Sequence, residues 1–427
     1  MVPMLSDRYP ALLGLGQALL VASAALAPRT VAATIFLSGL TLAAAVPTAT
    51  AAALRRPWPL PLQIAALLGL YLLISLGWSA ARLEGAGKLA IYVGLVGVLA
   101  VARPAIASLP DRALRLIALG TTIGVGVALA LLAIDELTGQ ALRRGLYRLL
   151  PFAQPPAKHI TVVNGELESL ASYLSNRSMA MLSLLLWPTI AIVAATQRRT
   201  VAIGLTVGAL VLAAVAIFRS QHETSMVALL VALITFALTL YAPRAGLAAT
   251  AIGWTVATLL VVPAVALAYQ GGLHQSKSLP YTAAQRVILW GYTAEQIPKR
   301  PMLGVGLAST KTLDALAGPH TPPPGYTYAR RTGPHAHNIY LQTWYELGAL
   351  GAALLLALGA TLLRAIDTMA PAARPHLLAA FASAAVIAAF SWSMWQAWFM
   401  AAFALAMMLA MLAAECARRT AGQTENS

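Results

Sequence analysis

Apolar segments of membrane length alternate with short polar turns along the chain. Reading apolar windows of roughly 17 to 25 residues as membrane-spanning helices, we count twelve of them. They cover residues 10–27, 31–53, 58–80, 87–102, 114–134, 177–196, 200–218, 223–242, 246–269, 339–363, 376–394 and 397–416. Helices are required because lipid offers backbone groups no hydrogen-bonding partner. The pattern therefore predicts an all-α integral membrane protein, with residues 1–427 as a single polytopic domain.

The composition indicates a membrane protein whose partners are anionic lipids or phosphates. Of 427 residues, 59% are hydrophobic and only 10% are charged, which excludes a water-soluble globular fold. The net charge of +15 would suggest a nucleic-acid partner in a soluble protein, but in a membrane protein anionic lipids and phosphates are expected instead. The single cysteine, Cys416, cannot form an intramolecular disulfide.

The distribution of Lys and Arg in the short turns predicts the topology. If both termini are cytoplasmic, nearly every inner turn carries at least one Arg. Two long loops, 135–176 and 270–338, then lie on the outer side. We expect no cleaved signal peptide, because the first apolar stretch lacks a small-residue cleavage region and runs into Pro28, Arg29 and another apolar span.

The two long outer loops are themselves basic, with eleven Lys or Arg against six Asp or Glu. This excess indicates an anionic partner on the outer side, although single cations can also sit among lipid headgroups. Within the second loop, Ala283 to Glu295 is predicted to be helical and to end before Pro298. Residues 318–334 are rich in Pro, Gly, Tyr and Thr and are expected to be irregular.

Two histidines lie where the second loop meets the tenth apolar segment. His337 is the strongest candidate for chemistry, because a neutral imidazole can take a proton from a hydroxyl near pH 7. A position at a helix N-terminus disfavours the charged imidazole and keeps it available as a base. The alternative for His335 and His337 is a structural role, capping the helix or binding a loop carbonyl.

Asn338 and Glu346 follow on the same predicted helix, and we expect structural roles for both. Asn338 is placed to cap the helix or to orient a substrate. Glu346 lies nine residues after His337, roughly two and a half turns further, so a direct hydrogen bond between them is not expected. It is expected to hold the helix or to pair with an Arg of another span.

Arg177, Arg219 and Arg286 are candidates for binding a diphosphate. The first two stand where a span meets the outer side, and the third lies on the loop helix. A guanidinium is planar, permanently charged and bidentate, so it suits a diphosphate better than a lysine does. The alternative is snorkelling at the interface or pairing with Glu223 or a loop carboxylate.

Metal and nucleotide chemistry are not expected. The outer segments show no Asp-x-Asp, no His-x-x-x-His and no cysteine cluster, and the chain has no P-loop. We therefore expect neither a metal nor ATP, with arginines neutralising the charge on a leaving diphosphate.

Several short motifs resemble those of the bacterial O-antigen ligase and polymerase superfamily. The matching pieces are Asn176-Arg177 ahead of Trp187-Pro188, the Arg219-Ser220 turn, Arg286 with Trp290, Pro301 through Gly304-Val305-Gly306-Leu307, and His335-Ala336-His337-Asn338 followed by Tyr340-Leu341-Gln342, Glu346 and Gly348 to Gly351. Among its members the sequence looks most like the lipopolysaccharide O-antigen ligases.

The resemblance implies a fold related to the C-type glycosyltransferases, with a large periplasmic loop, in the bacterial inner membrane. It implies metal-independent, inverting transfer of O-antigen from undecaprenyl diphosphate to a hydroxyl of the lipid A core, on the periplasmic side. By this resemblance the essential histidine of the family falls on His337, and its essential arginines fall on Arg219 and Arg286. Arg219 precedes Gln-His-Glu here rather than the more usual small residues.

Other functions remain open at this point. An O-antigen polymerase or a protein O-oligosaccharyltransferase would share the donor and the base but use a growing glycan or a protein serine as acceptor. A lipid transporter or flippase would place charges at the membrane midplane and show an inverted repeat. Here the charges lie mostly at span ends. A purely structural scaffold would leave the histidines and arginines without a purpose.

Overall fold

The computed structural model describes residues 9–55, 57–150, 152, 154–163, 166–318, 321–322, 329–390 and 392–424. Elements up to residue 196 are α1 (Tyr9–Leu26), η1 (Pro28–Thr30), α2 (Val31–Ala45), α3 (Pro47–Leu54), α4 (Leu60–Ser75), α5 (Arg82–Ser108), α6 (Asp111–Leu137), α7 (Ala141–Leu149), η3 (Ala157–His159), β1 (Ile160–Val163), β2 (Glu166–Leu170), η4 (Ser172–Ser175) and α8 (Asn176–Thr196). The later elements are α9 (Arg199–Ser220), α10 (Glu223–Tyr241), α11 (Pro243–Leu259), α12 (Val261–Gln270), η5 (Leu273–Gln275), α13 (Tyr281–Gln296), η6 (Ile297–Lys299), α14 (Thr310–Leu316), α15 (Ile339–Asp367), α16 (Arg374–Phe390) and α17 (Ala397–Thr424).

The predicted all-α membrane class is confirmed. Nine helices in the described part are long and apolar enough to cross a membrane, and the bent pair α11 and α12 would make a tenth. The apolar helices α4 and α16 are shorter than the other spans. All twelve predicted windows are largely helical, but the number of spans stays a prediction.

Three windows that we predicted as single helices are interrupted, and one of them, 339–363, is broken at Gly348 of α15. The other two breaks lie elsewhere. The window 31–53 divides at Val46 into α2 and α3, and the window 246–269 bends by 64° between α11 and α12. Pro263 explains the break between α11 and α12, because its ring would clash with the carbonyl of Leu259 one turn earlier and it has no N–H to donate there. A proline inside the apolar window 246–269 therefore divides it into two shorter helices.

The long loops contain structure of their own. The helix predicted over 283–295 is confirmed as α13. The first loop, predicted without elements, contains the amphipathic helix α7 and an antiparallel hairpin of β1 and β2, in which Ile160 pairs with Leu170. In the predicted irregular stretch 318–334, the described residues form no helix or strand, and residues 319–320 and 323–328 lie outside the described residues.

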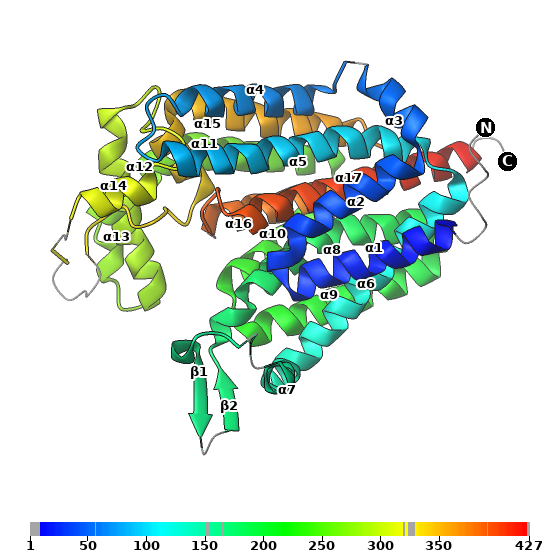
Figure 1. Cartoon of the computed structure of the whole chain (residues 1–427), viewed down its shortest axis with the longest axis horizontal. Coiled ribbons are helices and arrows are strands. Elements are labelled where there is room, and N and C mark those ends of the chain that lie inside the picture. Colours follow the sequence, from blue (N-terminus) through cyan, green and yellow to red (C-terminus); the bar gives the residue numbers. More distant parts are fainter. Residues whose placement is uncertain are drawn as a thin grey trace.

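The helices are arranged as one bundle with its connections gathered at the ends. In Figure 1, α1 begins and α17 ends at one end of the molecule, while α13 and α14 lie at the opposite end. The hairpin and α7 project away from the bundle near α6 and α8. The two described chain ends thus share a side, as the predicted topology requires, and the side of the membrane that they face stays a prediction.

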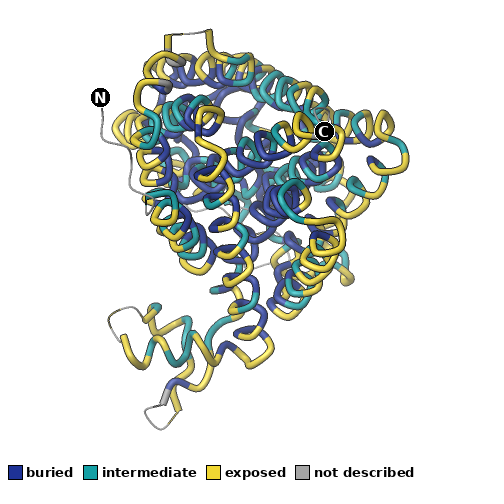
Figure 2. Tube along the Cα trace, turned by 90° about the vertical axis from the view of Figure 1, so that its right-hand side faces the viewer, coloured by how far each residue is buried: buried dark blue, intermediate teal, exposed yellow. Residues whose placement is uncertain are grey.

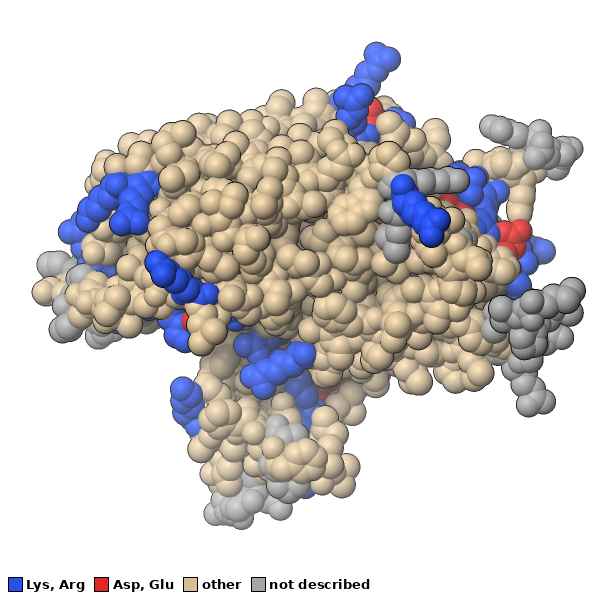
Figure 3. Space-filling model, turned by 45° about the horizontal axis from the view of Figure 1, so that its top comes forward, with Lys and Arg blue, Asp and Glu red and all other residues tan. Residues whose placement is uncertain are grey.

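The core is centred on α8. Every residue from Ser178 to Val193 is buried, as expected for a helix that is apolar all round. Figure 2 shows buried residues filling the middle of the bundle and exposed ones lining its outside. On that outside, leucines such as Leu67, Leu70 and Leu73 of α4 are about half exposed. The face in Figure 3 has a broad zone without Lys, Arg, Asp or Glu, which suits contact with lipid.

Helix α15 is interrupted at Gly348, which has a φ of 63°. The interruption leaves helix carbonyls without their usual donors. The N–H of Val305 donates to the carbonyl of Tyr345 at 3.1 Å, and the N–H of Gly306 donates to that of Glu346 at 2.8 Å. The segment 301–306 thereby takes the place of the missing helical turn on one side of the break.

The same segment satisfies the other side of the break. The N–H of Ala349 donates to the carbonyl of Pro301 at 2.8 Å, and the N–H of Leu350 donates to that of Met302 at 3.2 Å. Backbone groups at this depth need such partners, because lipid offers none. The motif running from Pro301 to Leu307 is therefore hydrogen-bonded to the backbone of α15 and is not a free loop.

This junction predicts a strict requirement for glycine at two positions. Gly304 and Gly348 both have positive φ, and a Cβ on either would collide with the backbone of the opposite segment. Replacing either with Ala should lower the free energy of unfolding by more than the roughly 1–2 kcal/mol that the left-handed conformation alone costs. Thermal unfolding in detergent measures this.

Gly97 provides the matched control, because a Cβ there meets nothing within 4 Å. Gly97→Ala lies inside α5 and should be neutral or stabilise the helix by about 0.5–1 kcal/mol. Melting temperatures of Gly304→Ala and Gly348→Ala equal to that of Gly97→Ala would contradict this account of the junction.

Candidate active site

The segment that carries the two histidines leads directly into α15. Asn338 caps this helix by accepting a hydrogen bond from the N–H of Leu341 at 3.0 Å, which confirms the expected cap. The rings of His335 and His337 lie 4.1 Å apart between centroids. His337 has a φ of 53°, a sparsely populated conformation of the kind that clusters at functional sites.

Helix α13 holds this histidine segment in place. The indole N–H of Trp290 donates to the carbonyl of Ala336, between the two histidines, at 2.6 Å. Arg286 lies on the same helix, about one turn earlier. The loop helix therefore positions both the backbone of the histidine segment and a guanidinium beside it.

The charge of Arg286 acts on two imidazoles, those of the partly buried His335 and the buried His222. Burial, followed by the nearby His337 and Arg286, lowers the pKa of His335 to about 3. Burial and the charge of Arg286 lower the pKa of His222, between α9 and α10, to about 4. Burial also lowers the pKa of Arg286, and Glu223 opposes this. His335 and His222 are consequently uncharged near pH 7.

Arg177 is linked to the same region through aromatic side chains. Its guanidinium lies 5.5 Å from the ring centre of Trp398, within the range of a cation–π interaction. Trp398 packs edge-on against Trp392 at 4.8 Å, and Trp392 lies 5.9 Å from the ring of His222. A chain of aromatic contacts thus connects Arg177 with His222, on which Arg286 acts electrostatically.

Arg219 stands somewhat apart. It is exposed at the C-terminal end of α9, three residues before His222, and it interacts electrostatically with Glu136 of α6. Glu136 also contacts Ser175 and Arg143, which places Arg219 toward the base of the first long loop. The structure therefore groups His335 and His337 with Arg286. Arg177 is linked to His222 through two tryptophans, and Arg219 lies toward α6.

The charges of the three candidate arginines are available for a ligand. Among the described residues, none of Arg177, Arg219 and Arg286 has a carboxylate oxygen within 4 Å. The described part of the chain also holds no group of three or more His, Cys, Asp or Glu residues arranged to bind a metal ion. The site thus offers guanidinium groups and imidazoles to an anionic molecule.

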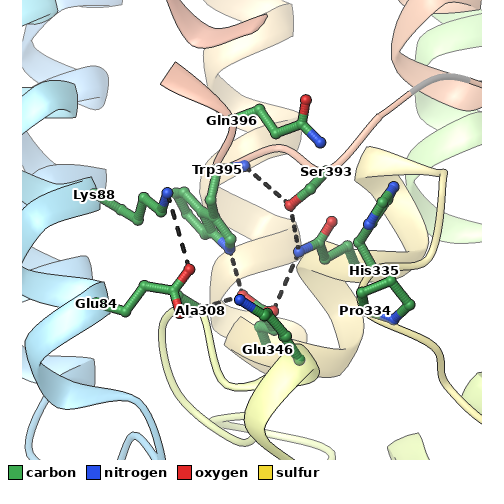
Figure 4. A pocket seen from close by; sticks show the side chains of 11 residues that line it. Glu84, Lys88, Ala308, Pro334, His335, Glu346, Ser393, Trp395 and Gln396 are labelled. Carbon is green, nitrogen blue, oxygen red and sulfur yellow. Dashed lines mark hydrogen bonds and ion pairs between the residues drawn. The ribbon is translucent and has the colours of Figure 1, made fainter. Parts of the chain in front are cut away.

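A pocket of about 270 Å³ adjoins the histidine segment (Figure 4). His335 is part of its wall, together with charged groups of α5, α14 and α15 and uncharged groups of the turn before α17. The lining residues are Glu84, Lys88, Ala308, Lys311, Pro334, His335, Gln342, Glu346, Ser393, Trp395 and Gln396. The pocket thus brings two lysines together with His335.

Glu346 forms part of the pocket wall and is fully buried. Its carboxylate accepts hydrogen bonds from the N–H of Ala308 at 2.9 Å and from the N–H and hydroxyl of Thr310. The side chains of Gln342 and Trp395 donate to it as well. Of the two roles expected for Glu346, the structure supports that of holding its helix, since these donors satisfy the carboxylate.

Comparison with known proteins now adds to this geometry. A family model described as O-antigen ligase matches residues 208–356. This segment is therefore similar to the O-antigen ligases. The match to the O-antigen ligases includes Arg219, Arg286 and both histidines, while Arg177 and Lys88 lie outside it.

Individual relatives agree with the family. A proposed polysaccharide ligase of Rickettsia prowazekii (strain Madrid E) is 32% identical over 123 residues, which are 28% of this chain and 29% of that protein. A proposed polysaccharide ligase of Rickettsia typhi (strain ATCC VR-144 / Wilmington) shows the same identity and coverage. One of Rickettsia conorii (strain ATCC VR-613 / Malish 7) is 31% identical over 120 residues, with coverage of 28% and 29%. The chain thus aligns with less than a third of the length of each of these relatives.

Sequence reasoning missed several groups of this candidate site. His222 follows Arg219 in the Arg-Ser-Gln-His-Glu turn between the windows 200–218 and 223–242. A histidine in the same short turn as a candidate arginine was a signal that could have identified it. Lys88 and Lys311 were counted only as outer cations, because nothing in their own segments connects them with the histidines. Trp398 falls inside the last predicted window, 397–416, where nothing singles it out from the other apolar residues.

The depressed pKa of His222 predicts a pH-dependent stability. Unfolding returns this imidazole to its ordinary pKa of about 6.5, so between pH 6.5 and about 4 the unfolded chain binds a proton that the folded chain does not. The melting temperature in detergent should therefore fall as the pH is lowered through this window. The His222→Gln variant should lose less stability than the parent protein.

His159 on η3, which contacts Tyr173, serves as the control position. His159→Gln should retain the full pH dependence of the parent protein. If His222→Gln also retained it, the buried His222 would not be the source.

Proposed function

We propose that the protein is a membrane glycosyltransferase that transfers O-antigen from undecaprenyl diphosphate to a hydroxyl of the lipid A core. The observation that carries this proposal is the pair of His335 and His337 beside Arg286, inside the segment that matches the O-antigen ligases. The relatives named as proposed polysaccharide ligases support the same class of reaction.

In the proposed reaction, His337 acts as the general base. It takes the proton of the acceptor hydroxyl, and the oxygen attacks the anomeric carbon of the donor sugar. The bond between that carbon and the diphosphate oxygen breaks, and its electron pair leaves with the diphosphate. Attack from the opposite face inverts the configuration of the carbon. The neighbouring His335 is uncharged near pH 7, so it does not repel the proton that His337 receives.

Arg286 is proposed to bind the diphosphate together with Arg219 and Arg177. The partial burial of Arg286 strengthens its attraction for an anion, because less water screens the charge. Charge builds up on the diphosphate as it leaves, and permanent cations stabilise it there without a metal ion. Free undecaprenyl diphosphate is then released.

The proposed function also implies a location and an orientation in the membrane. We place the protein in the bacterial inner membrane with twelve spans, both termini in the cytoplasm and the histidine segment on the periplasmic side. The polymerase and the protein O-oligosaccharyltransferase remain alternatives, since they differ only in the acceptor. Assaying the purified protein with lipid A core, with a growing glycan and with a serine-containing protein separates the three.

His337→Ala should reduce transfer by about 10²–10⁴-fold, the usual contribution of a general base. The measurement is ligation in vesicles with purified donor and acceptor, with metal chelated and ATP omitted. His159→Gln, in the hairpin segment, is the control and should retain activity. An active His337→Ala protein would remove this residue as the base.

Arg286→Lys should raise the KM for the donor by about tenfold or more, because an ammonium cannot bind a phosphate in two places at once. Arg244→Lys at the start of α11 is the matched control. Donor KM values that are the same in both variants would argue against Arg286 as the diphosphate ligand.

A further inference from the structure

The pocket beside His335 contains charges that the proposed reaction does not use. Lys88 of α5 and Lys311 of α14 both line it, although they are far apart in the sequence. Arg286, Arg219 and Arg177 are not among its lining residues. The pocket therefore contains two cations that are distinct from the arginines of the proposed diphosphate site.

These two lysines are weakly engaged by the protein itself. Lys88 contacts Glu84 at 3.9 Å, at the limit of an ion pair, and both side chains are partly exposed. Such pairs contribute little and exchange readily for a stronger partner. Lys311 has no carboxylate within 4 Å among the described residues. Both ammonium groups are thus available to an anion.

The wall between the lysines and the histidine pair also offers an unused polar atom. The Nε2 atom of His335 is buried and has no hydrogen-bond partner in the described structure. A buried polar atom without a partner is destabilising unless a ligand or water supplies the missing bond. Gln396 binds Trp398 through its side-chain oxygen, which leaves its NH₂ group as a further donor at the pocket.

The carboxylate of Glu346 does not prevent an anion from binding. It accepts hydrogen bonds from Ala308, Thr310, Gln342 and Trp395, so donors of the protein already surround its charge. Glu346 therefore has a structural role in the pocket wall. The groups left to bind an anion are the two lysines and the Nε2 atom of His335. The remaining carboxylate, Glu84, is the one that an incoming anion would displace from Lys88.

We propose that this pocket binds an anionic group, a phosphate or a carboxylate, on the acceptor saccharide, with Lys88 and Lys311 as its ligands. Such a group would sit beside His335, whose ring lies 4.1 Å from that of His337, so a hydroxyl of the same saccharide reaches the proposed base. The inference rests on the proposed function for the identity of the ligand as the acceptor. It makes the two lysines determinants of acceptor specificity.

Transfer kinetics test the role in specificity. The Lys88→Gln/Lys311→Gln double variant should raise the KM for a phosphorylated core acceptor by at least about tenfold, while the donor KM and kcat change little. With the same acceptor after phosphatase treatment, the double variant and the parent protein should behave alike. An acceptor that carries only carboxylates is measured in parallel and shows which anion is preferred.

Lys299→Gln is the matched control, because Lys299 lies at the same end of the molecule but binds Gln296 and does not line the pocket. It should leave the acceptor KM unchanged. The proposal is overturned if the double variant keeps the parent KM for the phosphorylated acceptor. It is also overturned if the KM for the dephosphorylated acceptor rises by the same factor.

Glu84→Gln gives a change of the opposite sign. Removing the competing carboxylate should lower the KM for the phosphorylated acceptor, because Lys88 no longer has to leave Glu84. General damage to the fold cannot produce this gain. A raised or unchanged KM in Glu84→Gln would contradict the role of Lys88 as an anion ligand.

Binding can also be measured without transfer. Acetylation of the parent protein in detergent, followed by mass spectrometry, reports the reactivity of each lysine. Glucose 6-phosphate and glucuronic acid, at equal concentration, should protect Lys88 and Lys311 but not Lys299, and glucose should protect none of them. Absence of protection by both anions overturns the pocket proposal. Protection in a protein that transfers no glycan would retain the pocket and overturn only the proposed function.

Discussion

The buried carboxylate of Glu346 and the break of α15 at Gly348 form the constraint on which the site depends. An ionised group inside an apolar bundle is destabilising by several kcal/mol unless donors surround it. The donors come from three separate parts of the chain: the start of α14, α15 itself and the turn before α17. One side chain therefore ties together the elements that frame the pocket.

The break of α15 extends this constraint to the N-terminal half of the bundle. The hydroxyl of Tyr71 on α4 donates to the carbonyls of Leu347 and Leu303, at 2.8 and 3.1 Å. A continuous helix would have used the carbonyl of Leu347 internally. Interrupting the helix frees backbone groups that then connect α4, segment 301–306 and α15, so α5, which carries Lys88, is held close to the histidine segment.

The histidine segment combines burial with positive charge. Arg286 raises the free energy of protonating His335 and His222, and burial acts in the same direction. A cluster of this kind favours anionic ligands over additional cations near neutral pH. The available cations form two sets, the arginines of the proposed diphosphate site and the lysines that line the pocket with His335. A transferase that must hold an anionic leaving group and an anionic acceptor apart has use for two such sets.

The sequence by itself determined the apolar helices of membrane length, the loop helix α13 and the cap at Asn338. These features follow from local patterns, because lipid enforces helices and caps depend on neighbouring residues. Only the tertiary structure decided that Gly348 breaks α15, that Glu346 binds backbone donors rather than an arginine, and that Lys88 and Lys311 share a pocket with His335. Such contacts join residues far apart in the chain, and no local pattern records which distant backbone group will satisfy a buried charge.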